Sequence, residues 1–270
     1  MIEVIDHGDV TQLRMSSRRS RLVGFSVSAY VARGTLVDTG FPAVGAELAR
    51  WLDAHPGVRG AVVTHRHEDH AGNVALLAAR GMPLAMSDAT RAAVRAVGPI
   101  GFYRRFTWNQ MAPLPADAPA FDPAPLALLP TPGHSHDHHA VWDAERETLF
   151  GGDLFLGVRV RVAHPGEDPR RLSTSLRAAA ALRPRRLFDA HRGPIANATE
   201  MLRAKADWID VTVAAIERRL AEGWSDRAIR REVLGREEMA GYFSRGDYSR
   251  TNFVRAVRRG RDARDGTRDT

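Results

Sequence analysis

Short apolar runs alternate with longer amphipathic stretches along the first half of the chain. The short runs are rich in branched residues or alternate between apolar and polar positions, which predicts strands. They cover residues 2–5, 10–15, 22–31, 36–38, 61–63 and 83–86. Residues 44–55 and 71–80 carry apolar side chains at helical spacing and predict helices. Strand and helix therefore alternate from residue 36 onward, a pattern typical of an α/β domain.

Residues 88–125 interrupt this alternation. Residues 88–97 predict a helix, residues 101–108 are aromatic and basic, and residues 113–125 are rich in Pro and Ala. A long insertion between core elements often covers a functional site. A plain surface excursion fits the pattern equally well, so both interpretations stay open.

The second half repeats the strand and helix pattern and then becomes wholly helical. Apolar runs predict strands at residues 126–129, 140–142, 148–150 and 186–190, with a helix at 170–182. Further helices are predicted at residues 199–222, 226–234 and 248–259, and residues 260–270 are predicted to be disordered. We therefore predict one α/β domain over residues 1–196 and a helical subdomain over residues 197–270.

The composition excludes some kinds of site and favours others. At 270 residues and 44% hydrophobic content, the chain has room for one large domain with a small appendage. It has no Cys, which excludes disulfides, thiolate zinc sites and a cysteine nucleophile. The net charge is +7, but the basic residues are spread along the chain. A solvated basic surface is favoured over nucleic-acid binding, which stays open as an alternative.

Membrane insertion and secretion are not expected. No apolar run approaches the length of a membrane span, and the N-terminus lacks a basic region followed by an apolar stretch. We expect a cytoplasmic protein with no membrane partner.

The stretch His65-Arg66-His67-Glu68-Asp69-His70 carries the most chemical information. Four of its six side chains, His65, His67, Asp69 and His70, are the candidate donors to zinc. Residues two apart on a turning loop share a side, so His65 and His67 can converge on one metal while Asp69 and His70 suit a second. Two adjacent metals usually catalyse hydrolysis.

Three more candidate ligands follow downstream. His134, Asp153 and His191 each lie just beyond the end of a predicted strand. Two similar strand-and-helix halves that meet at one edge would bring them to the histidine cluster. The sequence therefore predicts seven metal ligands drawn from distant parts of the chain.

These segments resemble the five motifs of the metallo-β-lactamase-fold superfamily, in their order. The motifs stand at residues 36–40, 64–70, 131–134, 151–153 and 190–191. The resemblance implies a four-layer αββα sandwich over residues 20–195, with a dinuclear site at one edge. The histidine-rich run at residues 133–139 is similar to that of a subgroup that includes hydrolases and an endoribonuclease with a helical C-terminal appendage.

The resemblance also implies how the ligands divide. One metal takes His65, His67 and His134, the other takes Asp69, His70 and His191, and Asp153 bridges both. Asp38 is not a ligand in this scheme and instead supports the metal-binding loop.

Three residues are candidates for roles beyond ligation. Asp69 is predicted to orient the attacking hydroxide and receive its proton. His138 occupies the position of the family's frequent second His. Arg192 stands where the family commonly has Gly, and beside the metals it could bind an anionic substrate group. Phe155 lies near the place where lactone-cleaving relatives tend to carry a tyrosine, which weakens a lactonase assignment.

The predicted function is a dinuclear zinc hydrolase that attacks a small ester, thioester or lactone with a hydroxide bridging the metals. Iron or manganese are the alternative metals for an all His and Asp ligand set. One alternative function is a nuclease or phosphodiesterase acting on RNA or another phosphodiester, and a further one is an iron-dependent oxidoreductase. The expected partner is a small-molecule substrate, with nucleic acid as the alternative, and the oligomeric state is not predicted.

Overall fold

The computed structural model describes residues 1–266 and divides into two compact units. The first comprises residues 1–130, 137–153 and 184–196. The second comprises residues 131–136, 154–183 and the chain from residue 197 onward. The units thus group two internal segments with the C-terminal helices, and a domain boundary at residue 196 stays a prediction.

The first unit contains a six-stranded sheet in sequential strand order. Its strands are β1 (Ile2–Asp6), β2 (Thr11–Met15), β3 (Val27–Ala32), β4 (Thr35–Val37), β5 (Gly60–Val62) and β6 (Leu84–Ala85). The first four pair antiparallel, and β4, β5 and β6 pair parallel. The parallel half places the ends of β4 and β5 side by side, and the loops that follow them therefore meet.

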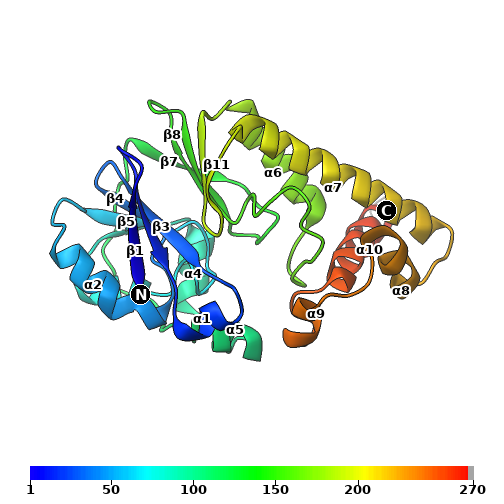
Figure 1. Ribbon diagram of the computed structural model, residues 1–270, viewed down its shortest axis with the longest axis horizontal. Helices are drawn as coiled ribbons and strands as arrows, with labels where there is room; N and C mark the ends of the chain where they lie inside the picture. The colour runs from blue at the N-terminus through cyan, green and yellow to red at the C-terminus, as the bar shows by residue number, and fades with distance from the viewer. Residues whose placement is uncertain (267–270) are drawn as a thin grey trace. The chain divides into compact units, whose positions relative to one another are not determined.

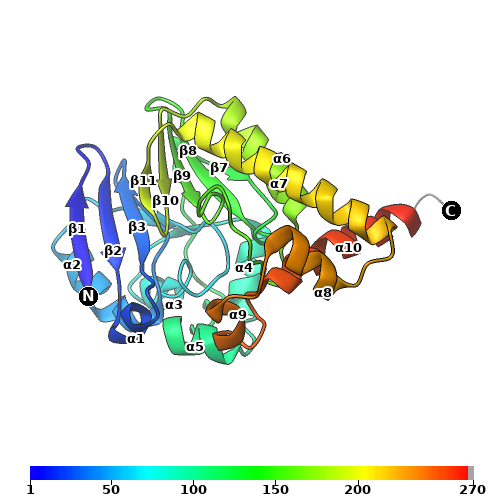
Figure 2. The same cartoon turned by 45° about the vertical axis from the view of Figure 1, so that its right-hand side comes forward.

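A five-stranded sheet lies in the same unit, in the order β11, β10, β9, β8, β7. Its strands are β7 (Leu126–Pro130), β8 (His139–Asp143), β9 (Thr148–Gly152), β10 (Arg186–Asp189) and β11 (Gly193–Ile195). Only β9 and β10 pair parallel, so the chain leaves the sheet at the end of each in the same direction. Figure 2 shows the strands of both sheets.

The two sheets share a core of apolar side chains. Tyr30 and Val62 of the first sheet belong to one buried cluster with Val141, Phe150 and Phe188 of the second. The ring of Tyr30 lies 5.1 Å from that of Phe188, measured between centroids. Burial of these large side chains is the main stabilisation of the sheet-on-sheet packing.

The first unit also contains helices, most of which bury apolar side chains against the other side of the six-stranded sheet. They are α1 (Arg18–Leu22), the 3-10 turn η1 (Pro42–Val44), α2 (Gly45–Asp53), α3 (Val74–Ala79), α4 (Asp88–Arg95) and α5 (Phe102–Trp108). Leu48 of α2, Leu77 of α3 and Val94 of α4 are fully buried in one cluster with Leu13 and Leu36 of the sheet. The insertion at 88–125 thus contributes to the core instead of running over the surface.

The second unit is helical (Figure 1). It contains α6 (Pro169–Ala181), α7 (Ala198–Ala221), α8 (Asp226–Ile229), the π-helical turn η2 (Arg230–Leu234), α9 (Met239–Phe243) and α10 (Arg250–Gly266). Ser173 of α6 donates a hydrogen bond to Asp210 of α7 at 2.6 Å. Among the described helices, none combines the length and the hydropathy that crossing a bilayer requires.

The structure corrects two sequence predictions and contains further elements that were not predicted. The strand expected at 22–31 begins only at Val27, because Ser17 and Ser20 form a capping box that starts α1. The elements α5, α9 and β11 were not predicted. The predicted disorder at 260–270 is wrong up to residue 266, where α10 continues, and residues 267–270 lie outside the described residues.

Candidate metal centre

The histidine loop follows β5 and is held by Asp38, the first residue after the neighbouring strand β4. Asp38 Oδ1 accepts a hydrogen bond from the backbone N of Thr64 at 2.8 Å, and Oδ2 accepts one from His70 Nδ1 at 2.7 Å. Both carboxylate oxygens also accept from the Thr64 hydroxyl at 3.0 Å. Asp38 thus supports the loop at both ends, as the sequence predicted.

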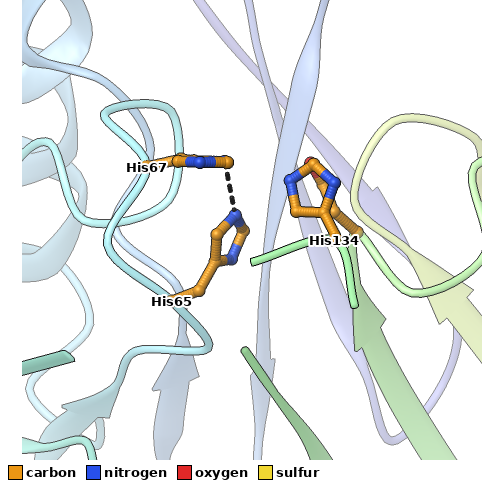
Figure 3. Close-up of side chains that lie close together, drawn as sticks. His65, His67 and His134 are labelled. Carbon is orange, nitrogen blue, oxygen red and sulfur yellow. Dashed lines mark hydrogen bonds between the residues drawn. The ribbon is translucent and has the colours of Figure 1, made fainter. Parts of the chain in front are cut away.

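One group of donors gathers His65, His67 and Asp153, whose candidate ligand atoms lie within 4.8 Å of one another. His65 Nε2 lies 3.0 Å from His67 Nδ1, the contact drawn as a dashed line in Figure 3. Thr64 Oγ1 lies 3.0 Å from His65 Nδ1 and so fixes the orientation of that ring. The two imidazoles therefore present one nitrogen each to a common point.

A second group gathers Asp69, His70 and His191, again within 4.8 Å. His191 Nε2 lies 3.3 Å from Asp69 Oδ2. Its other nitrogen, Nδ1, donates to the backbone oxygen of Ser26 at 2.8 Å. A carbonyl on Nδ1 sets the tautomer that leaves Nε2 available as a ligand.

Asp153 stands between the two groups. Its Oδ1 lies 3.2 Å from His70 Nε2 and 3.3 Å from His191 Nε2, while the residue also belongs to the first group. The preceding Gly152 has φ +51°, and a Cβ there would lie 2.9 Å from His138 Nε2. Only glycine fits this turn, which directs Asp153 toward both groups.

The carboxylates and imidazoles of the second group shift each other's pKa values. Burial alone lowers the pKa of His70, but the carboxylates of Asp153, Asp69 and Asp38 together raise it well above its ordinary value. The pKa of His191 is raised in the same way, chiefly by Asp153 acting against burial. Burial raises the pKa of Asp69, but the two imidazoles outweigh it and hold the value below normal. Cations are therefore favoured at this point.

A metal fits these residues. Five of the donors are at most 7% exposed, namely His65, His67, Asp69, His70 and Asp153. His70 Nε2 is buried, and its 3.2 Å contact with Asp153 Oδ1 lacks hydrogen-bond geometry. Buried polar atoms normally have partners, and metal ligation satisfies such an atom. The nitrogen and oxygen set suits zinc, iron or manganese.

His134 belongs to the second unit, where it is 5% exposed. Its Nδ1 lies 3.5 Å from Glu167 Oε1. Ligation by His134 of the metal held by His65 and His67 stays a prediction.

The structure places the two remaining candidates differently from each other. His138 is 1% exposed, and its Nε2 accepts a hydrogen bond from the backbone N of Asp153 at 3.1 Å. Arg192 is exposed, and its backbone N donates to Asp189 Oδ1 at 2.9 Å. Catalytic roles for Asp69, His138 and Arg192 stay predictions.

The sequence did not predict that α5 packs aromatic side chains beside the site. Trp108 is 6% exposed, and its ring lies 6.1 Å from that of His191 between centroids. Tyr103 is 8% exposed; burial and the charge of Asp69 raise its pKa to about 12. The signal was the aromatic and basic composition of 101–108, but no periodicity in so short a segment identified a helix.

Comparison with known proteins identifies the family. Residues 22–207 match the family described as Metallo-beta-lactamase superfamily. The match covers more than half of the chain, and the chain therefore belongs to this superfamily.

The relatives agree with this assignment. A Caenorhabditis elegans protein named Beta-lactamase-like protein 2 homolog is 40% identical over 76 residues, which are 28% of this chain and 24% of that protein. A protein of Emericella nidulans named Thioesterase pkgB is 29% identical over 165 residues, 60% of this chain and 43% of that protein. The chain thus covers less than half the length of these curated relatives.

A solved structure supports the fold. The metallo-beta-lactamase FIM-1 from Pseudomonas aeruginosa, in its mono-zinc form, aligns with a TM-score of 0.57 at 22% identity. The alignment covers 76% of this chain and 95% of that chain. Together with the two mixed sheets, it confirms the predicted αββα sandwich class. The predicted enzyme class agrees with membership of this superfamily, and the activity of the chain itself stays a prediction.

Proposed function

We propose that the protein is a dinuclear metal hydrolase that cleaves a small ester, thioester or lactone. The observation that supports this most directly is the position of Asp153, which belongs to the donor group of His65 and His67 and whose Oδ1 lies 3.2 Å from His70 Nε2 of the other group. A carboxylate that is shared between two donor groups suits a pair of metals, and metal pairs activate water for attack on carbonyl or phosphoryl centres.

Each donor group has its own part in this proposal. His65 and His67, with His134, would hold one metal, and Asp69, His70 and His191 would hold the other. Zinc, the leading candidate, would supply a water-derived nucleophile at neutral pH and a Lewis acid for the developing oxyanion. Asp69, whose Oδ2 lies 3.3 Å from His191 Nε2, would orient the nucleophile and accept its proton.

The substrate class is inferred from the wall and the rim of the site. Trp108 and Tyr103 are largely buried aromatic side chains that pack beside His191 and Asp69 in the first unit. Arg192 is an exposed cation one residue from His191 and can bind an anionic group of the substrate. A relative that is named a thioesterase aligns over 60% of the chain, which favours thioesters among the three substrates.

A second candidate function is that of a phosphodiesterase, and a basic hollow in the second unit supports it. A hollow of about 670 Å³ in this unit is lined by Arg227, Arg230, Arg255 and Arg258 with Tyr242. Asp226 and Glu237 also line it, and Asp226 pairs with Arg258. Arginines beside an aromatic ring suit a phosphate-bearing nucleotide chain. Steep weakening of substrate affinity with salt would favour this candidate over the ester hydrolase.

The test is a substrate screen of the protein loaded with zinc, and separately with iron or manganese. Substrates are p-nitrophenyl esters, acyl thioesters, lactones, bis-p-nitrophenyl phosphate and single-stranded RNA. We expect turnover of an ester or thioester that Asp69→Ala abolishes, whereas Asp117→Ala, at an exposed loop carboxylate, retains it. Full turnover by Asp69→Ala refutes the role of that residue. Turnover of RNA or the phosphodiester alone replaces the leading proposal with the second candidate.

A further inference from the structure

Helix α5 is tied to the metal-binding loop by one ion pair inside the first unit. Arg104 Nε donates to Glu68 Oε1 at 2.6 Å, and Arg104 Nη2 donates to Glu68 Oε2. Both ends are largely buried, because the side chains are 15% and 2% exposed. Two parallel bonds from a planar guanidinium fix the distance and the direction of the contact.

Glu68 occupies a sensitive place in the loop. It lies between His67 and Asp69, which belong to different donor groups. Its carboxylate is itself a good metal ligand, and it is nearly inaccessible to water. Since Arg104 engages both oxygens, the carboxylate is directed toward α5 and away from the two donor groups.

The same helix reaches the second donor group through Trp108. The Trp108 ring lies 5.0 Å from that of Phe41 in the core and 6.1 Å from that of His191. Arg104 and Trp108 are four residues apart, so they lie on one face of α5. The ion pair and the aromatic contacts thus fix the same helical face against both parts of the site.

We propose that Arg104 is a positioning residue of the metal centre: by holding Glu68 it keeps this carboxylate out of the coordination sphere and seats Trp108 against His191. The inference rests on the proposed metal site but not on any particular substrate. It gives the insertion at 88–125 a function, because α5 belongs to that insertion and completes the support of the loop.

Removal of one partner has a different consequence from removal of both. Arg104→Leu leaves the buried Glu68 carboxylate without its guanidinium. Beside the proposed metal pair, that carboxylate would compete as a ligand or displace the loop. Removal of both charges by Glu68→Leu together with Arg104→Leu creates no such competitor. The two substitutions should therefore be strongly non-additive.

The experiment measures zinc affinity by competition with a chromophoric chelator, on the full chain. Outer partners of metal ligands typically change affinity by roughly 10- to 100-fold, and we expect a loss in this range for Arg104→Leu. The double variant should recover most of the loss, and Glu68→Gln should bind zinc more tightly than Arg104→Leu. Arg105→Leu, at an exposed position of the same helix, is the matched control and should bind zinc like the wild type.

Two further readouts separate positioning from plain stability. Hydrogen exchange of the chelator-treated protein should show faster exchange over residues 102–108 in Arg104→Leu, and Arg104→Lys should restore part of the zinc affinity. Unchanged zinc affinity in a folded Arg104→Leu overturns the inference, as do losses that simply add in the double variant. If Arg104→Leu does not fold, Arg104→Lys decides: because lysine cannot make both bonds to Glu68, wild-type zinc affinity together with wild-type exchange in that variant also overturns the inference. Because zinc affinity is measured without a substrate, failure of the hydrolase proposal leaves this result intact.

Discussion

Asp38 Oδ2 accepts a hydrogen bond from His70 Nδ1 at 2.7 Å, and this single contact turns His70 Nε2 toward Asp153. The contact crosses from the end of β4 to the loop after β5, between residues that are 32 positions apart. Parallel pairing of β4 with β5 makes the contact possible, since it places both strand ends at one edge. Fold and candidate site are thus linked through a residue that is not itself a predicted ligand.

Substitution of Asp38 should weaken metal binding without removing a ligand. In Asp38→Ala the His70 ring and the backbone N of Thr64 lose their acceptor, so the loop loses its orientation. We expect zinc affinity to fall by roughly 10- to 100-fold in a chelator competition. Asp38→Asn retains one acceptor oxygen, and its zinc affinity should lie between that of Asp38→Ala and that of the wild type. Equal affinity of Asp38→Ala and wild type contradicts the supporting role.

Arg192 should act on substrate binding and not on the chemical step. For a substrate that carries a carboxylate or phosphate remote from the scissile bond, Arg192→Ala is expected to raise KM by about 10-fold at unchanged kcat. A neutral substrate of the same size should be turned over equally by both proteins. Steady-state kinetics on the pair of substrates provides the check, and an equal loss for both substrates would show that the charge of Arg192 is not used.

The hydroxyl of Tyr30 should contribute measurably to the free energy of unfolding. It donates to the backbone oxygen of Asp189 at 2.6 Å from a side chain that is 2% exposed. Tyr30→Phe leaves that buried oxygen without this donor, and we expect the free energy of unfolding to fall by about 1–3 kcal/mol. Urea denaturation measures it, with Tyr242→Phe as the control at a side chain that is 69% exposed. No difference between the two variants would mean that water replaces the lost bond.

Stability at low pH should depend on the pair of Asp9 and Arg186, which joins the turn after β1 to the start of β10. The hydrogen bonds from Arg186 lower the pKa of Asp9 from 3.8 to about 2. A lowered pKa contributes stability above the ordinary value, and this contribution is lost as the pH falls from about 4 to about 2. The pair is partly exposed, so its contribution at pH 7 should stay below about 1 kcal/mol.

The check compares wild type with Asp9→Asn in urea denaturation at pH 7 and at about pH 2.5. The difference in unfolding free energy should shrink at the lower pH, while Asp117→Asn should match the wild type at both. A difference that is constant or larger at low pH would show that the carboxylate charge does not carry the effect.

The motifs of the site could be predicted because each is contiguous and ends a strand. His65, His67, Asp69 and His70 lie on one loop, and the periodicity of the flanking apolar residues located that loop beyond β5. Asp153 and His191 could be placed because they follow apolar runs that form β9 and β10.

Other features could not be predicted because their causes are distant in sequence. Helix α5 is held by Glu68 and Phe41, which lie 36 and more residues before their partners. The seven residues of α5 are too few for their apolar positions to show a helical period. Similarly, the start of β3 is set by the serine capping box of α1, whose local hydrogen bonds prevail over the apolar run from residue 22.

The central claim is that His65, His67, Asp69, His70, Asp153 and His191 form a site for two metals that share Asp153. Calorimetric zinc titration of chelator-stripped protein, with metal analysis after desalting, tests it most directly. We predict two zinc ions per chain for the wild type and fewer than two at the same zinc concentration for Asp153→Ala. Saturation of the wild type at one ion or none, or two ions bound with unchanged affinity by Asp153→Ala, would contradict the account.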